Sequence, residues 1–113
     1  MITIYHNPRC RKSREGVSII EASGKPFDIV KYLDNKIRKS ELKDILKKLD
    51  ISPIELIRKN EAVWKSEFKG KSLSNDELIE IMIANPKLIE RPIVVNGDNA
   101  VIGRPPECIN RII

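Results

Sequence analysis

One cysteine of this 113-residue chain lies in a setting that favours a reactive thiolate. Cys10 stands where a predicted first strand passes into a predicted first helix. A sulfur at a helix N-terminus meets unpaired backbone N–H groups and the positive end of the helix dipole, and both favour the ionised form. The neighbours Arg9, Arg11 and Lys12 act in the same direction by Coulomb attraction. Most free cysteines are buried and inert, but these charged neighbours favour a reactive thiol.

The residues around Cys10 restrict the redox chemistry that it can perform. Ser13 takes the second position of a Cys-x-x-Cys spacing, so the pair cannot form an internal disulfide, and an external thiol must resolve any adduct on Cys10. Ser13 can instead donate a hydrogen bond to the Cys10 sulfur or cap its own helix. His6 is the only histidine, so a metal site built from His and Cys lacks ligands. Cys108 lies on a predicted apolar terminal helix, where we expect it in the core.

Three arginines at predicted element boundaries could serve an anion site. They are Arg58, Arg91 and Arg104, of which the second and third precede prolines. Each alone is typical of a surface residue or of a structural ion pair. Planar guanidinium groups suit a tetrahedral oxyanion because they donate bidentate hydrogen bonds. We expect Pro92 to be a cis proline that lies against the cysteine loop, which would bring Arg91 near it.

The N-terminal elements that position Cys10 predict a strand, a helix and a second, parallel strand. Residues 2–5 and 27–32 alternate in hydrophobicity, as strands do. Between them, apolar residues recur at helical spacing up to Ser23-Gly24, a typical helix end. Such a unit has a right-handed crossover.

The remainder predicts helices followed by a hairpin. Residues 42–49 carry one apolar helical stripe, and capping boxes at 52–55 and 74–77 predict two further helices. Residues 61–72 are polar and predict a loop. The last predicted elements are the strands 93–95 and 100–102 and a terminal helix after Pro105-Pro106. We therefore predict one α/β domain over residues 1–113, with a mixed sheet of about four strands and a helical insertion at about 36–90 between strands two and three.

Composition excludes several classes of protein. A chain that is 41% hydrophobic and 33% charged suits one folded domain with a hydrated surface. No apolar run approaches the roughly 18–20 residues of a membrane span, and the N-terminus lacks the features of a secretory signal. Two cysteines far apart make no disulfide framework, so we expect a cytoplasmic protein with both thiols reduced.

Nucleic-acid binding is also not expected as the main function, despite a net charge of +5. The basic residues over 36–48 alternate with acidic ones, as on a solvated helix face. Aromatic residues make up only 4% of the chain, too few for a base-stacking platform. Nothing in the sequence indicates an obligate oligomer, so we expect a monomer.

Taken together, the motifs resemble the glutaredoxin-coupled arsenate reductases of the ArsC/Spx-type thioredoxin-like family. The resemblance covers nearly the whole chain. It rests on the motifs His6-Asn7-Pro8-x-Cys10-x-x-Ser13-Arg14, Leu56-Ile57-Arg58-Lys59-Asn60, Arg91-Pro92-Ile93-Val94-Val95 and Arg104-Pro105-x-Glu107. It implies a thioredoxin-like sheet for the predicted α/β domain.

The resemblance also implies a mechanism. Cys10 attacks the arsenic of arsenate, His6 helps to keep the sulfur ionised, and Arg58, Arg91 and Arg104 bind the oxyanion. Glutathione, an external reductant and not a bound cofactor, then attacks the adduct. Glutaredoxin resolves the mixed species, and arsenite leaves.

One feature departs from this pattern, and it leaves alternatives open. Arg11-Lys12 occupies positions where related arsenate reductases carry small residues. A similar oxyanion, or a thiol adduct in a glutathione-dependent thiol reductase, therefore stays open as the substrate. A Spx-like regulator that docks on RNA polymerase is a further alternative, but those regulators usually carry Cys-x-x-Cys, and Ser13 breaks that spacing.

Overall fold

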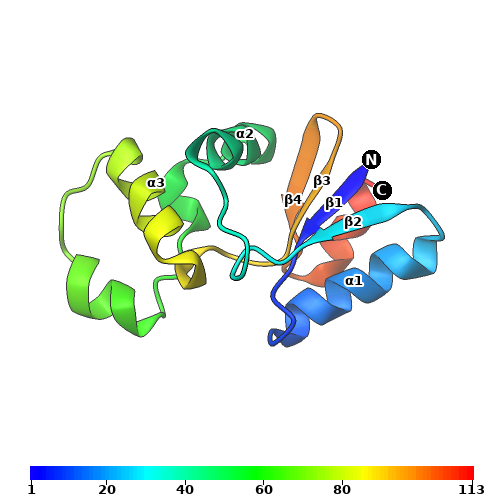
Figure 1. The fold of residues 1–113 in the computed structure, drawn as a ribbon, viewed down its shortest axis with the longest axis horizontal. Helices are drawn as coiled ribbons and strands as arrows, with labels where there is room; N and C mark the ends of the chain where they lie inside the picture. Colours follow the sequence, from blue (N-terminus) through cyan, green and yellow to red (C-terminus); the bar gives the residue numbers. More distant parts are fainter. The chain divides into compact units, whose positions relative to one another are not determined.

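The computed structural model describes residues 1–113, and these fall into two compact units. One unit comprises Met1–Asn35 together with Arg91–Ile113 and contains the sheet. The other comprises Lys36–Glu90 and is built of helical segments, coloured from cyan-green to yellow in Figure 1. The organisation as a single domain with an insertion at about 36–90 stays a prediction.

The sheet of the first unit has four strands and mixed direction. Its elements are β1 (Ile2–Tyr5), α1 (Arg11–Ser23), β2 (Phe27–Val30), β3 (Ile93–Asn96), β4 (Asn99–Ile102) and the 3₁₀ helix η4 (Pro106–Arg111). The strand order is β2-β1-β3-β4; β1 runs parallel to β2, and β3 runs antiparallel to both β1 and β4. The predicted four-stranded mixed sheet, its parallel strand-helix-strand unit and its hairpin are therefore confirmed.

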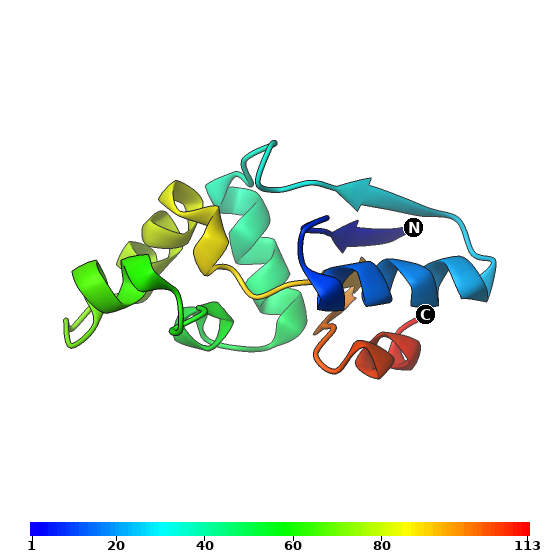
Figure 2. The ribbon, with the colours of Figure 1, turned by 90° about the horizontal axis from the view of Figure 1, so that it is seen from below.

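The core of this unit lies between the sheet and two helical elements, α1 and η4. Its central buried side chains come from all three parts: Ile2, Ile4, Ile20, Val94 and Ile109. The helix α1 and the C-terminal η4 lie side by side in Figure 2, where both cover the strands. Fully burying one such aliphatic side chain stabilises a fold by about 1.5–3 kcal/mol, so this cluster fixes α1, and with it the cysteine loop, on the sheet.

A glycine allows α1 to approach the sheet closely. A Cβ atom added at Gly16 would lie 2.9 Å from Pro92 Cγ, 3.1 Å from Ile109 Cδ1 and 3.4 Å from Ile4 Cδ1. These neighbours belong to the packed interior, so they have little room to move. The first turns of α1 thus sit directly against the residue that precedes β3.

We predict that Gly16→Val lowers the free energy of unfolding by about 2–3 kcal/mol, because a branched side chain overpacks this contact. Urea unfolding followed by circular dichroism measures the change. Ser18→Val is the control, since Ser18 is exposed on the same helix. Helix propensity cannot explain a loss at position 16, because valine is a better helix former than glycine and about equal to serine. Equal unfolding midpoints for the two variants would show that the close approach of α1 is not a tight contact.

Two elements of this unit differ from their predictions. The strand predicted over 27–32 stops at Val30, because the Lys31 carbonyl accepts hydrogen bonds from the N–H groups of Asp34 and Asn35 and closes a turn. The terminal helix is 3₁₀ instead of α, with the Cys108 N–H donating to the Pro105 carbonyl. Prolines supply no N–H, and 3₁₀ geometry is common in short helical runs such as this one.

The second unit contains α2 (Lys39–Leu49), η1 (Pro53–Leu56), η2 (Trp64–Phe68), α3 (Asn75–Ala84) and η3 (Pro86–Leu88). Both predicted capping boxes are present, but the first opens only a 3₁₀ turn. The prediction of a loop over 61–72 is wrong for 64–68, which form a π-helical turn. Trp64 is buried there, with its ring centroid 5.9 Å from that of Phe68. No helix of either unit is both long and apolar enough to span a membrane.

Candidate active site

The strand register brings three chain segments to one end of the sheet. Tyr5, the last residue of β1, pairs with Ile93, the first residue of β3, and Ile93 also pairs with Ile102, the last residue of β4. Arg91 precedes β3 and Arg104 follows β4. Both arginines therefore lie at the end of the sheet from which the cysteine loop leaves β1.

Cys10 is the N-cap residue of α1, as predicted. Its backbone is extended (φ −93°, ψ 123°), its N–H donates to the Asn7 carbonyl at 3.0 Å, and its carbonyl accepts from the Arg14 N–H at 3.0 Å. The side chain is half-buried. Cys108, predicted in the core, is also half-buried, and both cysteines are free thiols.

Buried polar groups brace the loop that carries Cys10. The Ser13 hydroxyl oxygen accepts a hydrogen bond from the Asn7 N–H at 2.9 Å and lies 2.6 Å from His6 Nδ1. The Asn7 side-chain oxygen accepts from the Arg9 N–H at 3.0 Å. Ser13 is fully buried, and His6 and Asn7 nearly so. Because buried polar groups are costly without partners, this set holds the loop in one shape.

The Ser13 hydroxyl therefore differs from both predicted uses. It neither contacts the Cys10 sulfur nor caps α1, since it is engaged by His6 and Asn7. The sequence did not predict the role of Asn7, whose side chain shapes the loop. The available signal was the Asn-Pro pair itself, because an asparagine side chain often accepts from the N–H two residues on.

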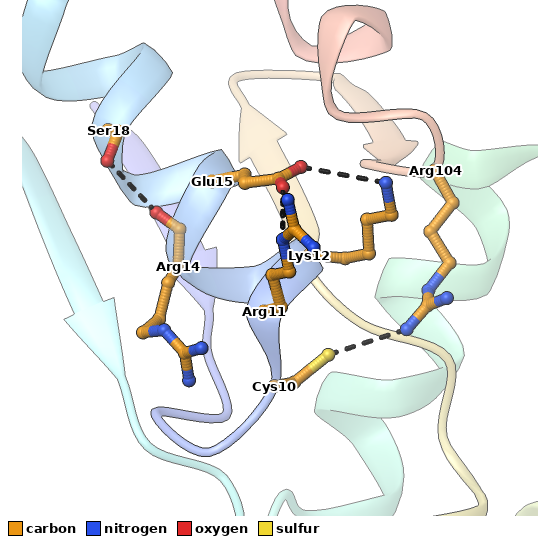
Figure 3. Close-up of polar contacts among 7 residues, drawn as sticks. All are labelled: Cys10, Arg11, Lys12, Arg14, Glu15, Ser18 and Arg104. Carbon is orange, nitrogen blue, oxygen red and sulfur yellow. Dashed lines mark hydrogen bonds and ion pairs between the residues drawn. The ribbon is translucent and has the colours of Figure 1, made fainter.

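Two of the three predicted arginines reach the thiol. Arg104 Nη2 donates to the Cys10 sulfur at 3.4 Å, as Figure 3 shows, and Arg104 Nε donates to the Arg91 carbonyl at 2.8 Å. The Arg91 guanidinium also acts on the thiol and lowers the pKa of Cys10. The Arg91-Pro92 bond is cis, as predicted, and so is Arg104-Pro105. The sulfur is thus next to donors from both strands of the hairpin.

Arg58 belongs to the second unit, and its contacts lie within that unit. Its N–H donates to the Leu88 carbonyl at 2.7 Å, and its Nε lies 3.7 Å from a Glu61 carboxylate oxygen. Its Nη1 is buried without a hydrogen-bond partner. The structure therefore unites Cys10, Arg91 and Arg104 in one unit, and the role of Arg58 at the same site stays a prediction.

Local interactions lower the pKa of Cys10 below its ordinary value. Burial is the largest single effect and would by itself raise the pKa of the thiol. The backbone N–H of Ser13, the Arg91 guanidinium and the backbone N–H of Lys12 act against burial and prevail. The first turn of α1 and Arg91 thus stabilise the thiolate, whereas Arg11 and Lys12 contact Glu15 with their side chains.

The pKa of His6 is also lowered, chiefly by burial and then by the positive charges of Lys31 and Arg14, while an interaction with the Ser13 backbone acts in the opposite direction. A lowered pKa leaves the ring mostly neutral at pH 7. His6 can then support the thiolate by holding Ser13 in place, and its effect does not depend on a positive charge. Its implied role in ionising the sulfur stays a prediction.

We predict that Cys10 alkylates with a midpoint clearly below the ordinary thiol pKa of about 8.5, because the alkylation rate follows the thiolate fraction. Iodoacetamide kinetics between pH 5 and 10, with the modified residue identified by mass spectrometry, measure this. The same protein unfolded in urea is the control, since it lacks the start of α1 and should titrate near the ordinary value. Identical folded and unfolded midpoints would rule out the stabilised thiolate.

The arrangement suits attack by a sulfur on a centre that carries anionic oxygens. The nucleophile is held at a helix start, and guanidinium donors from Arg91 and Arg104 lie beside it. Such donors stabilise negative charge that develops on oxygen. No group of three His, Cys, Asp or Glu side chains is arranged to hold a metal ion.

Comparison with known proteins places the chain in a family. The family model described as ArsC family matches residues 5–112, nearly the whole chain. The chain belongs to the ArsC family.

Two curated relatives of this ArsC chain cover it almost completely. An arsenate reductase of Haemophilus influenzae is 41% identical, over 99% of this chain and 98% of its own. A protein of Escherichia coli (strain K12), named uncharacterized protein YfgD, is 44% identical over 99% of this chain and 96% of its own.

A solved structure shows the same fold. An arsenate reductase from Vibrio cholerae superposes with a TM-score of 0.94 at 40% identity, covering 99% of this chain and 97% of its own. The sheet is therefore the thioredoxin-like one that the resemblance predicted. These comparisons confirm the family and the fold.

Proposed function

We propose that this ArsC-family chain is a cytoplasmic thiol oxidoreductase that reduces arsenate, or a similar oxyanion, through Cys10. The observation that carries the proposal is the half-buried Cys10 sulfur at the start of α1, with Arg104 Nη2 at 3.4 Å. Similarity to the arsenate reductases of Haemophilus influenzae and Vibrio cholerae supports the choice of arsenate. We expect the chain to act as a monomer.

The first step is attack by the Cys10 thiolate on arsenic. A sulfur–arsenic bond forms, and one arsenate oxygen leaves as water after protonation. Arg91 and Arg104 donate hydrogen bonds to the remaining oxygens and stabilise their charge. We include Arg58 in the proposal as a third hydrogen-bond donor to these oxygens. Neutral His6 and Ser13 hold the loop so that the sulfur keeps its place at the helix start.

An external thiol completes the reaction, because Ser13 provides no second sulfur. Glutathione attacks the adduct, the electron pair of the sulfur–arsenic bond passes to arsenic, and arsenite leaves. Overall, arsenic gains two electrons, and the Cys10 and glutathione sulfurs lose them on forming one disulfide. Arsenate loses one oxygen as water. Glutaredoxin then reduces the mixed disulfide and restores the Cys10 thiol.

The test is arsenate-dependent NADPH oxidation in the presence of glutathione, glutaredoxin and glutathione reductase. We expect turnover with the complete mixture and little turnover when glutathione or glutaredoxin is omitted. A parallel assay replaces arsenate by bis(2-hydroxyethyl) disulfide and omits glutaredoxin, which reduces this disulfide itself, and the rate without the protein is subtracted. Well-folded protein that turns over this disulfide, but not arsenate, would contradict the choice of substrate and favour a glutathione-dependent thiol reductase.

A further inference from the structure

Positively charged side chains flank Cys10 in its own loop and in the first turn of α1. Four exposed cations, Arg9, Arg11, Lys12 and Arg14, flank the half-buried cysteine, and together they form what we call the basic rim. The first turn of α1 contains no acidic residue. The nearest acidic side chain in sequence is Glu15, one turn further along the helix.

Two members of the basic rim already hold a carboxylate. Arg11 Nε lies 3.2 Å from one oxygen of Glu15, and Lys12 Nζ lies 3.7 Å from the other oxygen. Figure 3 shows the two cations converging on this carboxylate, on the helix that begins at Cys10. The pair thus binds a carboxylate group in the first turns of α1, the helix that begins at Cys10.

The contact with Glu15 is weak enough to be exchanged. The Arg11 side chain is 84% exposed, that of Lys12 is 47% exposed and that of Glu15 is 37% exposed. Exposed ion pairs of this kind contribute only about 0–1 kcal/mol. A carboxylate brought by a reactant can therefore replace Glu15 at little cost.

We propose that Arg11 and Lys12 select the thiol that reacts with Cys10 by its charge, and that this site takes thiols and disulfides bearing carboxylates. The inference rests on the proposed function only in that an external thiol resolves Cys10. Electrostatic attraction by such a rim raises association rates by about tenfold or more at low ionic strength. The residues that depart from the family pattern thus become specificity-determining residues for the reducing partner.

Three disulfides of similar size but different charge test this selection. They are 3,3′-dithiodipropionate, which is anionic, bis(2-hydroxyethyl) disulfide, which is neutral, and cystamine, which is cationic. In each reaction the Cys10 thiolate attacks one sulfur; the reagent disulfide breaks, a new disulfide forms on Cys10, and half of the reagent leaves as a thiolate. Mass spectrometry follows mixed-disulfide formation in a Cys108→Ser background, so only Cys10 reacts.

Each rate is divided by the rate of the same reagent with the urea-unfolded protein, because leaving thiols of lower pKa leave faster. For the parent protein we expect the anionic reagent to react about tenfold faster than the cationic one at low salt on this normalised scale. The preference should largely vanish at about 1 M salt, where the screening length falls to about 3 Å. Rates are compared as anionic-to-neutral ratios within each variant, so that changes in the thiolate fraction cancel.

Variants of the charged residues show which of them cause the preference for the anionic reagent. Arg11→Gln with Lys12→Gln should lower the anionic-to-neutral ratio about fivefold, whereas Glu15→Gln should raise it about twofold by removing the internal competitor. The double variant Lys25→Gln with Arg111→Gln is the matched control, because it also removes two positive charges. Both residues are exposed, and Lys25 lies beyond the far end of α1, about 20 Å along the helix. This control should leave the ratio unchanged.

Two results would overturn the inference. One is equal normalised rates of the three reagents at low salt. The other is a preference that the Arg11/Lys12 double variant and the Lys25/Arg111 double variant change to the same extent. Failure of the arsenate assay with a preserved charge preference would count against the proposed substrate alone. Arsenate turnover without any charge preference would count against the inference alone.

Discussion

Replacing Cys10 by serine is expected to abolish arsenate reduction, with a fall in kcat/KM of about 10³-fold or more. A serine hydroxyl stays protonated at neutral pH, so neither the start of α1 nor Arg91 can turn it into a comparable nucleophile. It also cannot form the disulfide with glutathione that balances the electrons. The NADPH-coupled assay measures the loss.

The control for this variant is Cys108→Ser, which removes the other half-buried thiol and should leave kcat/KM within about twofold. Urea unfolding of Cys10→Ser should give a midpoint close to that of the parent protein, because a half-buried sulfur contributes little packing. Residual activity within tenfold of the parent in well-folded Cys10→Ser would place the chemistry on another residue.

The second large effect is expected for Arg104→Gln, which should lower kcat/KM for arsenate by about 10²–10³-fold. The change removes the donor at 3.4 Å from the sulfur and the hydrogen bond from Nε to the Arg91 carbonyl. Arg104→Lys keeps the charge but loses the planar fork, so it should recover only part of the activity. Alkylation rates measured in parallel separate an effect on the thiolate from an effect on the oxyanion.

Arg111→Gln is the matched control, because Arg111 is an exposed arginine of η4 and should be replaced without loss. If Arg104→Gln retained activity within about twofold of the parent, the guanidinium beside Cys10 would have no part in binding or stabilising the substrate.

The sequence predicted the nucleophile better than its surroundings. The Asn-Pro turn and the helical spacing after it are local signals, so Cys10 could be placed at a helix start correctly. The meeting of Arg91 and Arg104 depends on the antiparallel pairing of Ile93 with Tyr5 and Ile102. Such pairing is set by contacts between distant segments, and spacing along the chain does not determine it.

Burial accounts for the other differences. Ser13 could not be assigned from its position alone, because its partners are fixed by the folding of the loop around His6 and Asn7. The lowered pKa of His6 likewise follows mainly from burial, which sequence neighbours do not reveal. Arg11 and Lys12 appeared to act on the adjacent sulfur, but the helix turns their side chains toward Glu15.

The central claim is that Cys10 and an external thiol together supply the two electrons that reduce arsenate. Its most direct test is a single-turnover reaction of the protein with arsenate and glutathione, without glutaredoxin, followed by intact-protein mass spectrometry and arsenite determination. The account predicts one arsenite for each Cys10 converted to a glutathione mixed disulfide, and neither product when arsenate is omitted. Release of no arsenite, with Cys10 recovered as the free thiol, would contradict it.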